Sequence, residues 1–128
     1  MQTLSNPKLK VELISGTSNV HVTATVNVSF NEFEKNLIKL LGLKFRLRCR
    51  LRGSDGLFKG PDDDLFLFPN KTIIADGTST FTATMNRNVL DEDDIDNDEV
   101  YAHFILQSMQ ALFPFTRSKD SLKITSNF

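Results

Sequence analysis

The ten residues from Leu43 to Arg52, Leu-Lys-Phe-Arg-Leu-Arg-Cys-Arg-Leu-Arg, alternate between apolar and cationic side chains without interruption. Successive side chains of a β-strand point to opposite faces of its sheet, whereas one face of a helix repeats about every 3.6 residues. The pattern therefore predicts a strand that buries one face and presents cations on the other. The apolar side chains are Leu43, Phe45, Leu47, Cys49 and Leu51. The cationic row, as we name it, is Lys44, Arg46, Arg48, Arg50 and Arg52.

Short segments with the same alternation recur along the rest of the chain and are separated by turn-forming residues. The clearest run from Val20 to Phe30 and from Thr78 to Asn86, each with one apolar and one polar face, as is typical of antiparallel sheets. We expect further strands at 8–14, 65–68, 72–75, 100–107 and 121–126. With the cationic strand, this makes about seven or eight strands.

The hydrophobic period changes once, between residues 31 and 41. Phe33, Leu37, Leu40 and Leu41 recur at the spacing of one face of a helix. Asn31 is a favourable N-cap, and Gly42 follows the last apolar residue, where a helix commonly ends. The segment therefore predicts one short amphipathic helix that lies across one end of the sheet.

These elements together predict an all-β fold, an antiparallel β-sandwich with one short helix near 31–41. The length of 128 residues suits a single domain covering 1–128. The lone cysteine, Cys49, excludes an internal disulfide. Immunoglobulin-like and C2-like topologies both fit the pattern, and the sequence does not choose between them.

No catalytic motif stands out in the chain. We find no nucleophile elbow, metalloprotease helix, phosphate-binding loop or dinucleotide fingerprint. His21 and His103 both fall on the polar faces of predicted strands. The leading interpretation is therefore a non-enzymatic binding or structural module, as part of a larger assembly, with another protein or a second copy as partner. The net charge of −1 argues against nucleic acid as a general ligand, and nothing points to a small-molecule substrate.

An acidic stretch at 91–99 suggests calcium as the one candidate cofactor. Its alternating carboxylates could converge on this cation, which prefers six to eight oxygen ligands. The EF-hand pattern fails, because Glu99 stands where glycine is required and Ile105 where the bidentate glutamate belongs. Loops at one end of a sandwich could instead bring two groups of acids together. The candidate ligands are Asp62, Asp64, Asp94, Asp96 and Asp98. The alternative interpretation is a solvated acidic loop.

The cationic row supports a further alternative, a polyanion binder. Side chains on one face of a strand recur about every 6.6 Å, so five cations could follow phosphate or sulfate groups. Two other uses remain open. Neighbouring strands could place Glu12, Glu32, Glu34 or the acidic loops opposite the cations and so neutralise them. A charged strand could also protect a sheet edge from pairing with another chain.

The chain shows no targeting or membrane-spanning signal. Its N-terminus, Met-Gln-Thr-Leu-Ser-Asn-Pro, lacks the cationic start and apolar run of a signal peptide. No window of about 18 apolar residues occurs, so we expect no membrane span. These features are compatible with a cytoplasmic protein, although the sequence does not fix the compartment.

Overall fold

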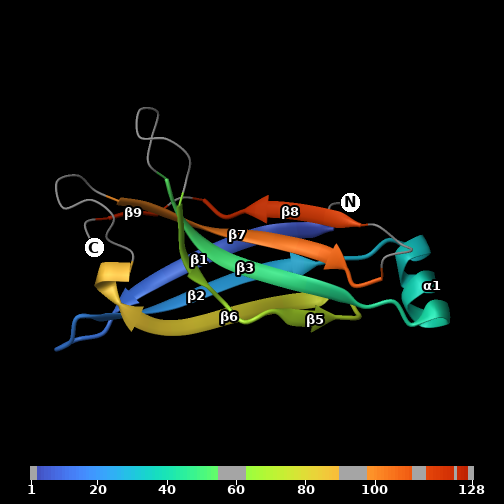
Figure 1. The fold of residues 1–128 in the computed structure, drawn as a ribbon, viewed down its shortest axis with the longest axis horizontal. Helices are drawn as coiled ribbons and strands as arrows, with labels where there is room; N and C mark the ends of the chain where they lie inside the picture. The colour runs from blue at the N-terminus through green and yellow to red at the C-terminus, as the bar shows by residue number, and fades with distance from the viewer. Residues whose placement is uncertain (1–2, 55–62, 90–97, 111–114, 123, 127–128) are drawn as a thin grey trace.

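The protein folds as two antiparallel sheets with one α-helix at an end of the molecule (Figure 1). The computed structural model describes residues 3–54, 63–89, 98–110, 115–122 and 124–126. The two antiparallel sheets and the single helix confirm the expected all-β sandwich. The finer expectation, an immunoglobulin-like or C2-like topology, remains a prediction. Within the described ranges, no helix is long and apolar enough to cross a membrane.

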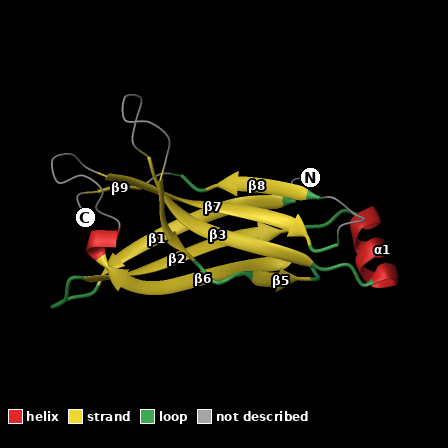
Figure 2. Cartoon of the chain, in the orientation of Figure 1, coloured by secondary structure: helices red, strands yellow, loops and turns green. Residues whose placement is uncertain are grey.

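The smaller sheet has three strands in the order β1-β2-β6. Its strands are β1 (Leu4–Leu13), β2 (Asn19–Val28) and β6 (Gly77–Asn86). The larger sheet has six strands, with β4-β3-β7-β8 as its main order, while β5 also pairs with β3 and β9 with β7. Its strands are β3 (Phe45–Ser54), β4 (Asp63–Leu67), β5 (Lys71–Ile73), β7 (Asp98–Ser108), β8 (Thr116–Asp120) and β9 (Ile124–Ser126). Figure 2 shows how strands dominate the molecule.

The core lies between the sheets and consists of the apolar rows that the alternation predicts. The inward residues of β3, from Phe45 to Leu51, and the alternate residues of β2 and β7 are buried. Aromatic pairs add directional contacts across this core. The Phe81 ring of β6 lies 6.2 Å from the Phe104 ring of β7, centroid to centroid, and so joins the two sheets. Burying each such side chain contributes about 1.5–3 kcal/mol to the stability of the fold.

The helix α1 (Glu32–Leu41) begins and ends at the residues that the sequence indicates. Asn31 and Glu34 form a capping box. The Asn31 side chain accepts from the Glu34 amide at 2.7 Å, and the Asn31 amide donates to the Glu34 carboxylate at 2.8 Å. Gly42 ends the helix in the left-handed conformation, with φ of 66°, which glycine adopts without a steric penalty.

The rotation of α1 about its axis differs from the prediction. Phe33, Leu40 and Leu41 are 65%, 76% and 69% exposed, so the expected apolar face does not pack across the sheet. Only Leu37 and Ile38 pack against the core, beside the buried Glu34. Asp76 contributes to this orientation, because its carboxylate accepts from the Phe30 amide at 2.8 Å and contacts Lys35 Nζ at 3.3 Å.

Several strands also begin or end at residues other than those that the sequence predicts. β1 begins at Leu4, before the expected start, and a register irregularity between Ser5 and Lys8 accommodates Pro7 within it. β7 begins at Asp98, so the end of the acidic stretch is strand and not loop. β7 ends at Ser108, one residue beyond the expected strand at 100–107. The region after Phe115 holds two short strands, because β8 and β9 pair with different parts of β7.

Candidate functional site

The cationic row lies on the outer face of the six-stranded sheet, as the alternation predicts. β3 is an interior strand of that sheet. It pairs with β7 along its whole length, from Phe45 opposite Ser108 to Ser54 opposite Glu99. On its other side it pairs with β4 and β5. The cations therefore do not protect a sheet edge, and that interpretation was wrong because the sequence does not show which strands are neighbours.

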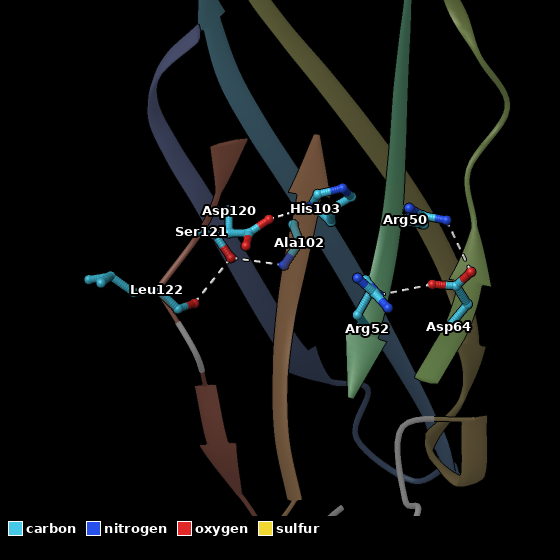
Figure 3. Close-up of polar contacts among 8 residues, drawn as sticks. All are labelled: Arg50, Arg52, Asp64, Ala102, His103, Asp120, Ser121 and Leu122. Carbon is cyan, nitrogen blue, oxygen red and sulfur yellow. Dashed lines mark hydrogen bonds and ion pairs between the residues drawn. The ribbon is translucent and has the colours of Figure 1, made fainter. Parts of the chain in front are cut away.

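Asp64 of β4 neutralises one end of the cationic row (Figure 3). Its Oδ2 lies 3.2 Å from Arg50 Nη1, and its Oδ1 lies 3.1 Å from Arg52 Nε. A register irregularity between Leu51 and Arg52 places Asp64 opposite Arg52, where regular pairing would place Leu65. The extra residue in β4 thus brings a carboxylate, and not a leucine, onto the cationic face.

At the other end of the cationic row, no acidic side chain in the described part of the chain pairs with the cations. Within those ranges Lys44, Arg46 and Arg48 form no ion pair, and Lys44 and Arg48 are exposed. The acids that the sequence suggested as partners are occupied elsewhere. Glu12 lies 3.5 Å from Lys10, Glu32 lies 4.0 Å from Lys35, and Glu34 belongs to the capping box. Neutralisation by these three acids was therefore a wrong expectation.

A hollow of about 330 Å³ opens on the same face, beside Arg48 and Arg50. His103 and Ile105 of β7 line one side of it, and Asn70 lines another. The hollow lies where the chain passes from β4 to β5. There the amide of the buried Phe68 donates to the Cys49 carbonyl at 3.1 Å, and Pro69, which has no amide hydrogen, follows. The interruption separates the two short strands along β3 and leaves room for a ligand group.

His103 stands directly opposite Arg50 in the β3–β7 ladder, so both side chains face the hollow. Its Nδ1 hydrogen-bonds the Asp120 carboxylate from β8 (Figure 3). A carboxylate only accepts, so Nδ1 carries the proton, and this contact fixes the orientation of a ring that is 16% exposed. The other ring nitrogen is the atom left for a ligand.

Two side chains near the hollow that could act as nucleophiles, Ser121 and Cys49, are hydrogen-bonded to backbone or buried. The Ser121 hydroxyl accepts from the Ala102 amide at 2.8 Å and donates to the Leu122 carbonyl at 3.1 Å (Figure 3). It is therefore occupied by backbone, although Asp120 and His103 are close in the sheet. Cys49 is buried on the inner face, and burial raises the pKa of its thiol to about 12. A thiol in this state is a poor nucleophile near neutral pH.

Of the proposed calcium ligands, Asp64 alone has a described side chain. Asp62, Asp94 and Asp96 lie outside the described residues. The backbone of Asp98 opens β7 opposite Ser126, and its side chain is not described. Both Asp64 oxygens contact arginines. Among the residues that are described, no three histidine, cysteine, aspartate or glutamate side chains are grouped to hold a metal.

Sequence reasoning found the cations of this site and missed the residues that surround them. His103 was placed on a polar strand face, but nothing in the sequence aligned it with Arg50. Asn70 follows the predicted strand at 65–68 and is not among the candidate site residues that the sequence suggests. Comparisons with protein-family models, with curated proteins and with solved structures found no match.

Proposed function

We propose that the chain is a non-enzymatic binding module that holds a polyanionic partner on the outer face of its six-stranded sheet. The observation that carries the proposal is the asymmetry of the cationic row. Asp64 engages two of its members, while Lys44, Arg46 and Arg48 form no ion pair with any described residue.

The spacing of these cations favours a partner with repeated negative charges. Alternate side chains of a strand lie about 6.6 Å apart, and two like charges at that distance repel by roughly 0.6 kcal/mol in water. A bound polyanion removes this repulsion and releases its own counterions, which is the main source of affinity in such complexes. Because β3 is paired on both sides, its backbone is already ordered, and ligand binding orders only the side chains of the cations.

The hollow beside Arg48 supports the same proposal. The Arg48 guanidinium and the Asn70 side-chain amide supply donors around one concave site, while Asp64 holds Arg50 at its side. Ile105 adds an apolar contact. A sulfate or phosphate ester group of the polyanion would occupy this hollow while the rest of the chain follows Arg46 and Lys44.

The surroundings of two potential nucleophiles, Ser121 and Cys49, support the proposal that the module is non-enzymatic. The Ser121 hydroxyl is bound by backbone on both sides, and Cys49 is buried with a raised pKa. Neither has the activated, accessible form that nucleophilic catalysis requires.

A heparin oligosaccharide is a suitable probe, with binding measured at several salt concentrations. We expect affinity to fall steeply with salt, and Arg46→Gln with Arg48→Gln to weaken binding by at least tenfold and to lower the salt slope by about two. The matched control is Lys8→Gln with Lys10→Gln, which removes the same charge from the other sheet. Equal losses in both variants, or binding that salt does not affect, would refute the site. If salt does not affect binding, the module would instead be a structural one with an uncharged partner.

A further inference from the structure

The second candidate surface is the free edge of the three-stranded sheet. β6 pairs with β2 over ten residues without a register shift, from Asn19 opposite Asn86 to Val28 opposite Gly77. β6 ends the sheet, and among the described residues none outside β2 forms a backbone hydrogen bond with it. Figure 1 shows β6 along one margin of the molecule. About half of its backbone groups therefore face outward without a strand to pair with.

The other sheet edges carry features that prevent pairing with another chain. β1 contains a proline and a register irregularity, and its outward residues include Lys8 and Lys10. β4 and β5 are short and are separated by a segment with Pro69. β8 has only five residues, three of them charged. Proteins commonly protect their edges by charges, prolines, bulges and short strands.

β6 has none of these features. From Gly77 to Asn86 it contains no charged residue and no proline, and its ladder with β2 is regular. Lys71 of β5 approaches the strand, with Nζ 5.3 Å from the Phe81 ring centroid. This cation belongs to the other sheet, and the outward residues of β6 are themselves uncharged.

We propose that the free edge of β6 pairs with β6 of a second copy of this chain, in an antiparallel two-fold dimer. Two observations favour a copy over another partner. A strand without charges meets no like-charge repulsion when it faces itself. In addition, a two-fold axis normal to the sheet places the solvent-exposed face of one β6 strand beside that of the other. The exposed threonines of one copy therefore lie opposite threonines of the second copy. Thr82 then lies opposite Thr82 or Thr80 of the second copy, as the register dictates, and threonine pairs favour strand association.

The dimer would be closed. A two-fold contact uses the β6 edge of both copies, and the protected β1 edges then terminate a six-stranded sheet β1-β2-β6-β6-β2-β1. Contacts of this isologous kind do not propagate into fibres. The proposal concerns the three-stranded sheet alone, so it does not depend on polyanion binding by the other sheet.

The direct test is the solution mass of the intact chain against concentration, by light scattering and sedimentation. We expect a reversible change from 14.5 kDa toward twice this mass. It should occur at concentrations up to about 200 µM, since interfaces below about 1,200 Å² are weak. Hydrogen exchange should show alternate β6 amides gaining protection at high concentration. This second readout requires no variant. A monomer at every concentration, or β6 amides that do not change, would overturn the proposal.

Variants that add charge to β6 test whether this strand forms the dimer contact. Thr80→Lys with Thr82→Lys, and Thr80→Glu with Thr82→Glu, change exposed side chains and should each abolish dimers. An equimolar mixture of the two should restore them, because opposite charges then face each other. The matched control is Thr116→Lys with Ser118→Lys on the exposed edge strand β8, which should dimerise normally. Dimers that persist in both β6 variants would show that another surface is used.

Discussion

Replacing Asp64 by asparagine should change stability and ligand binding in opposite directions. The Asp64 carboxylate holds Arg50 and Arg52 at 3.2 and 3.1 Å. Asparagine has nearly the same shape, so the fold should persist while the negative charge is lost. Arg50 then becomes available to a polyanion, next to Arg48 and the hollow.

The magnitudes follow from this geometry. The three side chains are 41%, 32% and 26% exposed, so the two ion pairs are well screened, and we expect Asp64→Asn to lower the free energy of unfolding by about 1 kcal/mol. One additional cation in contact with the ligand should steepen the plot of log K against log salt by about one. At about 0.1 M salt, this corresponds to a gain in affinity of roughly tenfold.

Stability is measured by urea unfolding, and affinity by fluorescence anisotropy of a labelled heparin oligosaccharide at four salt concentrations. The matched control is Glu12→Gln, which removes one negative charge from an exposed pair with Lys10 on the other sheet. It should leave the salt slope unchanged. If Asp64→Asn binds no better than the parent protein, or if Glu12→Gln gains as much, the bound ligand does not use this end of the cationic row.

Three further predictions concern side chains with defined surroundings. The Cys49 thiol, whose pKa burial raises to about 12, should not react with a thiol reagent at about pH 8 until the protein unfolds; rapid labelling of the native protein would contradict its burial. The bond from the Phe30 amide, and then the charge and hydrogen bond of Lys35, hold the pKa of Asp76 below its ordinary value of 3.8, so the stability from this carboxylate is present above that value and is lost as pH falls through the folded-state pKa. Asp76→Asn should therefore destabilise by less than about 1 kcal/mol at neutral pH, because the carboxylate is 41% exposed and solvent screens it. The loss should be smaller still in acid, and equal urea midpoint shifts at both pH values would show that the charge is not involved. Calcium added to metal-stripped protein should leave the amide resonances of Asp64 unshifted, because arginines hold both its oxygens, whereas saturable shifts at Asp64 would restore it as a ligand.

Local sequence patterns predicted the faces of the main strands and the limits of the helix. Alternation from Leu43 to Arg52 needs no knowledge of neighbouring strands, because the pleat itself sends successive side chains to opposite faces. The limits of α1 were equally accessible, since a capping box and a C-terminal glycine act within a few residues. The strands after residue 107 were less predictable, because β8 is polar and is held by its pairing with β7.

The candidate site was predictable only in its cations. The sequence placed five of them on one face, but it could not show that Asp64 would reach two of them. That contact depends on an extra residue in β4 and on the pairing of β4 with β3. The position of His103 opposite Arg50 likewise depends on the register between β3 and β7. Registers of this kind join residues that are far apart in the chain.

The sequence by itself therefore determined which side chains of each strand face the core, where the helix begins and ends, and that cations occupy one row. These properties depend on backbone geometry over a few residues. Only the tertiary structure decided that β3 lies inside a sheet, that β6 ends one, and that much of the apolar face of α1 is exposed. The order and register of strands arise from packing among distant segments, so a local pattern does not contain them.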